Sequence, residues 1–366
     1  MRIIQIIDVR WYNAGADFAV IQAKALAGIG HDVLLMANPG SPPALKAREA
    51  GLDVFEKIDF AGLNILNSVA KLVRETRRFR PDVIFAHRGE SHLVAALASR
   101  KTGCPVARFR GDVRPPRRGL FSRILNERLT GGIAVSTARL KDEYEKNYRL
   151  NGIPMQIIYP GIDASRFLTG RSKEELKAAF GLDPDALTVG IAGRLSPVKG
   201  HEIFIKAAGI VTERFPDAQF VIAGGDAQLS AMGLAEEAVK LGLGNIRFTG
   251  LINNIEELIS LFDIGVVASI GSEMICRVLM EYFAARVAVV ATDINQVSEL
   301  MSLSGGGMVV PPGDSKSMAE AIIELCRDKR KRDDAAASGK SWVDNKRSLK
   351  HLALETEQFL GRVIDD

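Results

Sequence analysis

Cysteine is scarce in this 366-residue chain, and long apolar runs are missing. The three cysteines, Cys104, Cys276 and Cys326, form no closely spaced pair, which argues against a disulfide framework and a zinc knuckle. No run approaches the about 20 uncharged apolar residues of a membrane-spanning helix, and the start MRIIQIIDVR lacks the architecture of a cleavable signal. We therefore expect a cytoplasmic protein.

Two glycine-rich nucleotide motifs are missing as well. No segment has the glycine spacing of a Walker loop, and no dinucleotide fingerprint follows a predicted strand, which disfavours kinases, GTPases and dehydrogenases. Aromatic residues make up only 6% of the chain, and no aromatic stacking platform accompanies its most arginine-rich segment, 108–128. Nucleic acid is therefore not an expected partner.

The net charge of +4 conceals an asymmetry between the two halves of the chain. Residues 1–160 carry 25 Lys and Arg against 15 Asp and Glu, a balance of +10, whereas the remaining residues carry 23 against 29, a balance of −6. By charge alone, a basic half steers toward an anionic partner such as nucleic acid, anionic lipid headgroups or a phosphorylated substrate, and the lack of a stacking platform disfavours the first of these.

Short β-branched runs alternate with helix-length segments in both halves. They are RIIQII, HDVLLMA, DVIFAH, PVARF and GIAVS in the first half, and TVGIAG, FVIAGG, IGVVAS and VAVVAT in the second. Continuous apolar strands joined through helices indicate parallel sheets that are covered on both faces. We predict an α/β protein with two Rossmann-like, doubly wound domains.

The boundary between these domains is expected at IYPGIDASRF, residues 158–167, where a Pro-Gly pair interrupts the pattern. We place the first domain at 1–160 and the second at 161–343. Ligands of such sheets bind beyond the carboxyl ends of the strands, so two facing domains would form an interdomain cleft between these ends. Functional residues are therefore expected in the turns that follow strands.

The turn GRLSPVKG, residues 193–200, follows the predicted strand TVGIAG. Its glycines let the backbone approach a ligand, and Arg194 and Lys199 bring two cations to the start of the next helix, whose dipole also favours an anion. This arrangement suits a diphosphate. The alternative is an ordinary turn whose two cations face water.

The segment SEMICRVLME, residues 272–281, contains two glutamates that lie eight positions apart. We expect Glu273 to precede a helix and Glu281 to lie inside it, at most about 12 Å away, with free helix amides between them. A nucleotide sugar has hydroxyls at both ends and a diphosphate in the middle, which matches this layout. The alternative is one surface glutamate and one glutamate that favours a helix start.

Together these motifs resemble the retaining glycosyltransferases of family 4, which have the GT-B architecture of two facing Rossmann-like domains. The matching elements extend over nearly the whole chain: YNAGADFAVIQAKALAGIGHDVLLMA, PDVIFAH, IYPGIDASRF, GRLSPVKG, FVIAGG, RFTG, the glutamate pair and GGGMVVPPGD. The resemblance implies a terminal helix, 344–366, that returns to the first domain. It also implies sugar transfer from a nucleotide-diphosphate sugar, with retention of configuration and without a metal or other cofactor.

The resemblance assigns roles to residues of the second domain. Arg194 and Lys199 would stabilise the leaving diphosphate, Glu281 would bind the ribose, and Glu273 would contact the transferred sugar. The further expected donor contacts are Gly15, Gly193, Phe248 and Gly250, the last two beside the base, and Met274, Ile275, Cys276 and Arg277, whose amides would meet the diphosphate. Glycines are usual after the first glutamate in this family, so the bulkier side chains here are expected to reshape the sugar pocket.

The first domain contains candidate acceptor contacts. Arg110 and Asp112 follow a predicted strand at a place where the family often has a histidine. Arg110 would hold an acceptor phosphate or carboxylate, and Asp112 would orient it or accept a hydroxyl proton, which makes both candidate catalytic residues. The alternative is a buried pair that holds a loop. Arg114 is a further candidate, and so is His87, which is equally well explained as a strand-end histidine with internal hydrogen bonds.

Seven arginines and only two acids lie between Arg108 and Arg128. This face is either solvated or in contact with an anionic acceptor at the inner face of a membrane, such as a phosphorylated lipid-linked glycan or a lipopolysaccharide core. The leading hypothesis is a cytoplasmic or membrane-peripheral glycosyltransferase of polysaccharide or lipopolysaccharide biosynthesis. Two rivals stay open: a GT-B nucleotide-sugar epimerase and a non-catalytic nucleotide-sugar-binding subunit.

Overall fold

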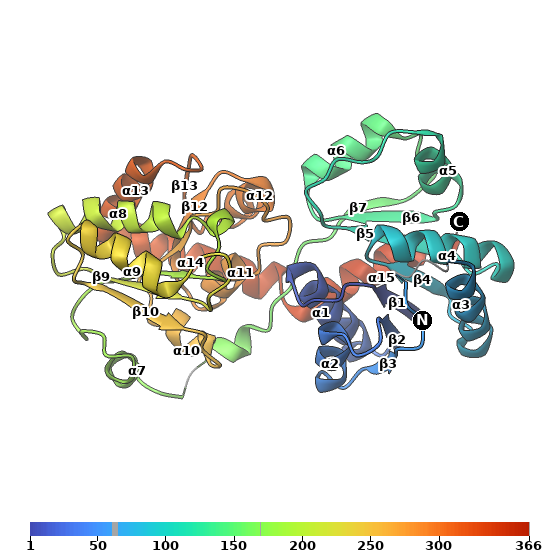
Figure 1. Ribbon diagram of the computed structural model, residues 1–366, viewed down its shortest axis with the longest axis horizontal. Helices are drawn as coiled ribbons and strands as arrows, with labels where there is room; N and C mark the ends of the chain where they lie inside the picture. The colour runs from blue at the N-terminus through green and yellow to red at the C-terminus, as the bar shows by residue number, and fades with distance from the viewer. Residues whose placement is uncertain (61–64, 169, 366) are drawn as a thin grey trace. The chain divides into compact units, whose positions relative to one another are not determined.

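The computed structural model describes residues 1–60, 65–168 and 170–365. The chain forms two compact units, Met1–Gly161 together with Leu349–Asp366, and Ile162–Ser348 (Figure 1). The predicted domain ranges 1–160, 161–343 and 344–366 also include residues 61–64, 169 and 366, which lie outside the described residues. The chain passes from one unit to the other twice, after Gly161 and after Ser348.

The first unit is built on a 7-stranded parallel sheet with the order β3-β2-β1-β4-β5-β6-β7. Its strands are β1 (Arg2–Ile7), β2 (Asp32–Ala37), β3 (Asp53–Phe55), β4 (Val83–Ala86), β5 (Val106–Arg110), β6 (Gly132–Val135) and β7 (Met155–Ile157). Ile3 of β1 pairs with Val33 of β2 and with Val83 of β4. The strand order reverses between β1 and β4, so ligands are expected beyond the carboxyl ends of these two strands.

Helices cover this sheet. They are α1 (Ala14–Gly28), α2 (Pro42–Glu49), α3 (Ile65–Phe79), α4 (Gly89–Thr102), α5 (Leu120–Arg128), α6 (Ala138–Asn147) and α15 (Leu349–Asp365). Leu72 of α3 and Val94 of α4 belong to one buried cluster with Ile84 of β4. The C-terminal helix α15 packs against α1 and the sheet, so closely that a Cβ on Gly132 of β6 would lie 2.3 Å from the Cγ2 atom of Val363. The last residues of the chain therefore complete the first unit.

The second unit is built on a 6-stranded parallel sheet with the order β10-β9-β8-β11-β12-β13. Its strands are β8 (Thr188–Ala192), β9 (Gln219–Ala223), β10 (Ile246–Gly250), β11 (Ile264–Val267), β12 (Ala288–Thr292) and β13 (Gly307–Val310). Its helices are α7 (Lys173–Ala179), α8 (His201–Arg214), α9 (Ala231–Lys240), α10 (Ile255–Ile259), α11 (Arg277–Ala284), α12 (Asn295–Ser304), α13 (Ser315–Arg327) and α14 (Lys329–Lys346), with 3-10 turns η1 (Ala164–Phe167) and η2 (Pro197–Lys199). The order of this sheet reverses between β8 and β11.

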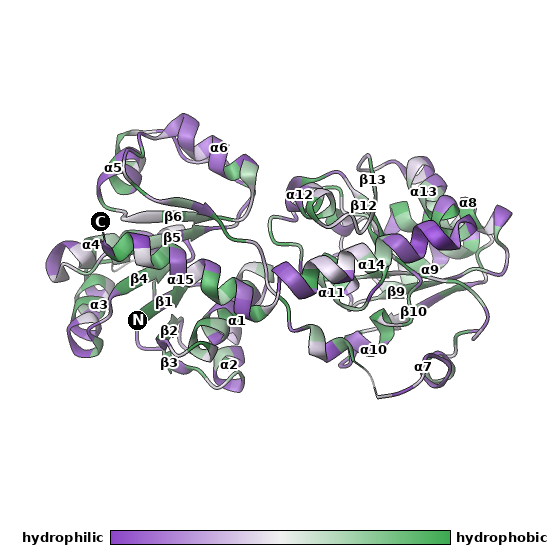
Figure 2. Cartoon of the chain, turned by 180° about the vertical axis from the view of Figure 1, so that it is seen from behind, coloured by the Kyte–Doolittle hydropathy of each residue, from purple (hydrophilic) through white to green (hydrophobic). Residues whose placement is uncertain are grey.

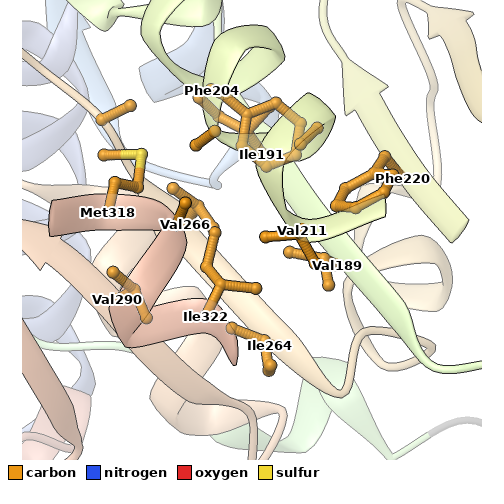
Figure 3. Packing of buried hydrophobic residues seen from close by; sticks show 14 of the residues in the cluster. Val189, Ile191, Phe204, Val211, Phe220, Ile264, Val266, Val290, Met318 and Ile322 are labelled. Atoms are coloured by element: carbon orange, nitrogen blue, oxygen red, sulfur yellow. The ribbon is translucent and has the colours of Figure 1, made fainter. Parts of the chain in front are cut away.

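The core of the second unit lies between its sheet and the helices α8, α9 and α13. Phe204 and Val211 of α8, and Met318 and Ile322 of α13, gather around Val266 of β11 (Figure 3). All five side chains are fully buried. Burying a side chain of this size stabilises the folded state by about 1.5–3 kcal/mol, so this layer fixes both helices against the sheet that positions the site.

Side-chain caps mark several helix starts. Asn13, Thr137, Ser172, Ser230 and Asp314 each accept a hydrogen bond from a backbone N–H of the first turn of α1, α6, α7, α9 and α13. Such residues satisfy the free N–H groups of a helix start. At α7 the reciprocal bond from Glu175 completes a capping box.

The prediction of two doubly wound parallel sheets is confirmed. Each of the nine predicted runs forms a strand, whereas β3, β7, β10 and β13, which lie at the four edges of the two sheets, were not among them. Hydrophobic residues line the central strands, and hydrophilic residues gather on the helices (Figure 2). Among the described residues, none of the helices is both long enough and apolar enough to pass through a bilayer.

Candidate functional site

The turn between β8 and α8 lies at the carboxyl edge of the second sheet. Gly193 follows β8 and donates its N–H to the carbonyl of Ala223, at the end of β9, at 2.8 Å. Gly200 has φ +72°, and a Cβ there would lie 1.9 Å from the carbonyl oxygen of Ala268, directly after β11. Only glycine fits this left-handed backbone at such a close approach. The turn is therefore held against both neighbours of β8.

The two predicted cations of this turn differ in their surroundings. Arg194 is exposed, and its guanidinium makes no hydrogen bond or ion pair with any residue that the structure describes. The side chain of Lys199 is 29% exposed, and its Nζ pairs with Oε1 of Glu273. Burial opposes the charge of Lys199, but the carboxylate of Glu273 prevails and raises the pKa of Lys199 above its usual value. Lys199 is thus a partnered cation, and Arg194 is available to an anion.

Glu273 lies in the loop after β11 and is only 5% exposed. Its Oε1 also accepts a hydrogen bond from Oγ of Ser269 at 2.8 Å. Ser272 and Glu273 both have left-handed backbone, with φ +65° and +55°. This conformation costs residues with a side chain about 1–2 kcal/mol each and is typical of sites where surrounding contacts impose a geometry.

The loop after Glu273 is fastened by the start of α12. Asn295 donates from Nδ2 to the carbonyl of Ser272, and Gln296 accepts the Cys276 N–H on its Oε1 at 2.9 Å. The three side chains that were expected to reshape the sugar pocket, Met274, Ile275 and Cys276, are all buried. The Cys276 amide, a predicted diphosphate contact, is therefore already bonded to a side chain.

Glu281 lies within α11 and pairs with Arg277, the first residue of that helix, at 2.9 Å from Arg277 Nε to Glu281 Oε1. The adjacent Tyr282 accepts the Ala192 N–H on its hydroxyl at 2.9 Å, which ties α11 to the end of β8. The structure thus places Glu273 and Glu281 at the two ends of one short segment, each paired with a cation. Across the described parts of the chain, no three or more His, Cys, Asp and Glu side chains are grouped to hold a metal ion.

The predicted base contacts lie at the end of β10. Gly250 has φ +66°, and its carbonyl accepts the Gly224 N–H at 3.1 Å. A Cβ on Gly224 would lie 1.9 Å from the Gly193 carbonyl oxygen, so the ends of β8, β9 and β10 lie close together. Phe248 is half-buried and packs against the core. Gly193 and Gly250 therefore share one edge of the sheet with the charged residues.

In the first unit, Gly15 lies in the first turn of α1, two residues after the capping residue Asn13. Asn13 Oδ1 accepts the Ala16 N–H at 2.9 Å. This turn follows β1, one of the two strands at which the sheet order reverses. Gly15 is thus placed where a doubly wound sheet binds ligands.

Arg110, the last residue of β5, is bonded within its own unit. Its guanidinium donates to the Tyr144 hydroxyl at 3.3 Å, to Asp112 Oδ1 at 3.0 Å, and to the carbonyls of Arg114 and, at 3.2 Å, Pro115. Burial opposes this charge, but Tyr144 and Asp112 outweigh it and raise the pKa of Arg110. These contacts agree with the alternative in which Arg110 holds a loop. The side chains of Asp112 and Arg114 are exposed.

His87 lies among three aromatic rings, those of Phe18, Phe85 and Phe109, at centroid distances of 6.2, 5.0 and 5.3 Å. Its Nε2 lies 3.0 Å from Nε2 of Gln5, which donates the hydrogen bond. Burial lowers the pKa of His87 to about 3, so the imidazole is neutral at neutral pH. With 8% of its surface exposed, His87 offers little area to an acceptor.

A polar cluster that sequence reasoning missed lies at the reversal point of the first sheet. Asp8, directly after β1, accepts from the N–H and the Oγ of Ser91 at 3.2 and 3.1 Å, and Arg88 Nε lies 3.9 Å from its Oδ1. Burial raises the pKa of Asp8 to about 6, although Arg88 acts in the opposite direction. The available sequence signal was a carboxylate directly after the first apolar strand.

The arginine-rich segment 108–128 presents apolar and basic side chains side by side. Leu120 and Phe121 of α5 are 77% and 64% exposed, and Ile124 is exposed as well. Five of the seven arginines are exposed: Arg114, Arg117, Arg118, Arg123 and Arg128. Only Arg108 and Arg110 are buried.

Two family models match the chain. Residues 18–166 match the model described as Glycosyltransferase Family 4, and residues 186–328 match the model described as Glycosyl transferases group 1. The second match contains all four charged residues of the predicted donor site, Arg194, Lys199, Glu273 and Glu281.

Individual proteins are similar as well. The chain is 32% identical over 213 residues to the lipopolysaccharide core biosynthesis mannosyltransferase LpsB of Rhizobium meliloti (strain 1021). The matched region covers 56% of this chain and 58% of that protein. It is 27% identical over 375 residues to the alpha-D-kanosaminyltransferase of Streptomyces kanamyceticus. The matched region covers 90% of this chain and 94% of that protein. A crystal structure of Anabaena Alr3699/HepE in complex with UDP has a TM-score of 0.86 at 20% identity, covering 99% of this chain and 100% of that one. This last similarity concerns the fold.

Proposed function

Because the chain belongs to the glycosyltransferases of family 4 and group 1, we propose that it transfers a sugar from a nucleoside-diphosphate sugar to an acceptor hydroxyl. One observation carries the proposal: Lys199 is paired with the buried Glu273, beside Arg194, which has no partner among the described residues. A partnered and an unpartnered cation at the edge of a parallel sheet suit an anionic leaving group.

The diphosphate of the donor would meet Arg194 and Lys199. Negative charge grows on the β-phosphate as the bond to the sugar breaks, so fixed cations favour the transition state over the ground state. Glu273 would hold hydroxyls of the transferred sugar, and Glu281 would hold those of the ribose. The fold resembles a structure that contains UDP, so a uridine diphosphate sugar is the first donor to test.

We propose transfer with retention of configuration, as expected for the family. The bond between the anomeric carbon and the β-phosphate oxygen breaks, the acceptor oxygen bonds to that carbon on the same face, and its proton passes to the leaving diphosphate. No enzyme nucleophile is needed in this scheme.

The proposed acceptor is a glycan, a lipid-linked glycan or a lipopolysaccharide-type molecule with anionic groups. Arg114 and Asp112 are exposed in the first unit, as is part of Arg88, and these residues could contact such an acceptor. Arg110 and His87 would act indirectly, through the loop and the aromatic cluster that they hold. The similarity to a lipopolysaccharide core mannosyltransferase supports this acceptor class.

Product analysis tests the proposal. The purified protein is incubated with UDP-, GDP- and ADP-sugars, with and without lipopolysaccharide-core or lipid-linked glycan acceptors. Free nucleoside diphosphate that appears only with an acceptor supports transfer. Conversion of the donor sugar without an acceptor would indicate an epimerase, and donor binding without turnover on any acceptor would indicate a binding subunit.

We also propose that the first unit attaches to the anionic cytoplasmic face of a membrane. Leu120 and Phe121 of α5 are exposed between arginines, a combination typical of helices that lie in a bilayer interface. Each arginine near an anionic surface contributes about 1 kcal/mol. A glycosyltransferase placed there would meet lipid-linked acceptors directly.

Sedimentation with vesicles of phosphatidylglycerol and phosphatidylcholine tests this attachment. Binding at low salt should fall strongly in Phe121→Asp and should be absent with phosphatidylcholine alone. Leu354→Asp is the matched control, because Leu354 is an exposed apolar residue of α15 in the same unit. Equal binding by Phe121→Asp and Leu354→Asp would exclude α5 as the contact.

A further inference from the structure

A buried arginine of the first unit lacks a counter-ion among the described residues. Arg108, in the middle of β5, is only 8% exposed. Its Nη1 donates to Nδ1 of His92, on α4, at 3.2 Å, whereas its Nε has no hydrogen-bond partner and no described carboxylate pairs with it. A guanidinium stays protonated in a protein, and burying a cation without a partner charge is unfavourable. The fold therefore keeps an uncompensated positive charge at this position.

His92, the hydrogen-bond partner of Arg108, brings no charge of its own. Its Nε2 lies 2.7 Å from Oγ1 of Thr130, and Thr130 donates its hydroxyl hydrogen to the Leu125 carbonyl at 2.6 Å. His92 therefore donates from Nε2 and accepts from Arg108 on Nδ1, as a neutral imidazole does. Burial, reinforced by the charge of Arg108, holds the pKa of His92 well below its usual range.

The unbonded edge of the guanidinium lies beside a gap at the start of α4. Nε–H and one hydrogen of Nη2 point along the same edge, which can hold two oxygens of an anion. A Cβ on Gly89 would lie 3.8 Å from Nη2 of Arg108, and apart from the backbone of α4 and the neighbours of Gly89 no other described atom lies within 4 Å of that point. Gly89 is itself exposed, so a ligand can reach this gap from solvent.

The start of α4 adds further donors to this gap. The first N–H groups of a helix, here those of Gly89 and Glu90, have no partner within the helix, and the helix dipole favours an anion beside them. The two acids at this helix start, Asp8 and Glu90, lie 3.9 and 3.8 Å from Nε of Arg88. They are thus balanced by Arg88 and not by Arg108.

We propose that Arg108 and the start of α4 form an anion site that binds a phosphate group of the acceptor. The guanidinium edge takes two oxygens and the helix amides can take a third, so a phosphate fits better than a carboxylate. Arg108 pairs in the sheet with Ala86, the last residue of β4, at the edge where doubly wound sheets bind ligands. The acceptor contact expected of Arg110, whose guanidinium is bonded to its own loop, would pass to Arg108.

Titration with inorganic phosphate tests the site without any need for turnover. Affinity is measured by phosphorus NMR at constant ionic strength in the wild type, Arg108→Gln and Arg194→Met, of which the last lacks a cation of the proposed donor site. Arg108→Gln should lose a phosphate site, seen as binding at least about tenfold weaker, that Arg194→Met retains. A wild type that binds no phosphate, or a single phosphate site that is lost in Arg194→Met and kept in Arg108→Gln, would overturn the inference.

Gly89→Ala tests the gap itself and does not depend on the folding of Arg108→Gln. The backbone of Gly89 is not left-handed, so alanine fits the helix, but its methyl group occupies the gap. Phosphate affinity should fall while the melting temperature is maintained. Gly28→Ala is the matched control, because Gly28 is a glycine of α1 in the same unit with nothing within 4 Å of its Cβ position. Equal phosphate affinity in these two variants would contradict the site.

Initial rates with a lipopolysaccharide-core acceptor, intact and after phosphatase treatment, test the contact with the acceptor, which rests on the proposed function. Arg108→Gln should raise the KM of the intact acceptor about tenfold and leave that of the treated acceptor unchanged. If Arg108→Gln loses phosphate binding but keeps both KM values, the acceptor contact is wrong and the site takes free phosphate. An equal rise of both KM values would also contradict it. Absence of transfer to any acceptor would refute the proposed function but not the anion site.

Discussion

Replacing Lys199 by methionine tests the electrostatic role of the turn between β8 and α8. Methionine keeps most of the length of the side chain and removes the charge. Loss of one preorganised charge contact to a leaving group lowers kcat about 10²- to 10³-fold, equivalent to about 2.7–4 kcal/mol. Donor affinity should change much less, because the charge that Lys199 meets grows toward the transition state.

The same variant should also be less stable in the absence of a nucleotide. In this variant Glu273, which is 5% exposed, loses its ion pair with Lys199 and keeps the hydrogen bond from Ser269. Breaking a fully buried pair costs about 3–5 kcal/mol, but Lys199 is 29% exposed, so we expect a loss of about 1–3 kcal/mol.

The assay combines steady-state release of nucleoside diphosphate at saturating donor, calorimetric donor affinity and urea unfolding. Lys206→Met is the matched control, because Lys206 lies on α8 and forms a long, more exposed pair with Glu237 at 3.9 Å. Unchanged turnover in Lys199→Met would refute the assignment of Lys199 to the leaving group. Turnover and affinity that fall by the same factor would refute the argument that the contact strengthens in the transition state.

Three further predictions concern Glu281, two glycines of the second unit, and Asp8 of the first unit. Glu281→Ala should weaken binding of nucleotides and nucleosides alike and leave turnover at saturating donor closer to that of the wild type, as calorimetry and initial rates would show. Gly200→Ala should destabilise the protein by about 2–4 kcal/mol in urea unfolding, because its Cβ meets a backbone carbonyl, whereas Gly209→Ala in α8, with nothing within 4 Å, should stabilise it by about 0.5–1 kcal/mol. Burial raises the pKa of Asp8 from 3.8 to about 6. The folded state therefore loses stability as the pH rises from 3.8 to about 6, and the total loss at higher pH is about 3 kcal/mol. Asp8→Asn should remove that pH dependence and be the more stable protein at pH 7 provided that the bonds to Ser91 persist; a variant with an unchanged pH profile of unfolding would contradict this.

The fold was predictable where burial is complete and not where it is partial. Strands such as β11 and β12 are almost wholly apolar because both faces of the sheet are covered. The missed strands β3, β7, β10 and β13 have one hydrogen-bonded neighbour each, and most of their residues are only half-buried. Edge strands need no apolar run, so their sequences resemble those of loops.

The candidate site could be predicted in part because its charged residues are close in sequence to strand ends. Arg194 and Lys199 lie in the turn after β8 and Glu273 lies in the loop after β11, and neighbouring parallel strands bring these two segments together. The ion pair between Lys199 and Glu273 joins residues 74 positions apart, and no periodicity indicates it.

The surroundings of Arg110 and His87 were not predictable for a similar reason. Arg110 is held by Tyr144, which lies 34 residues further along the chain, and His87 is surrounded by rings from three different elements. A sequence motif indicates that a residue follows a strand. It does not indicate whether distant residues have already used its hydrogen-bonding groups.

The return of α15 to the first unit has a consequence for synthesis. Translation delivers Ile162–Ser348 as an uninterrupted stretch, whereas the other unit still lacks the helix that lies over Gly132 when residue 348 emerges. Domains tend to fold as their residues leave the ribosome, usually in chain order. Here the second unit can complete its fold before the first, because the part of the first sheet that α15 covers stays exposed until residues 349–365 are made.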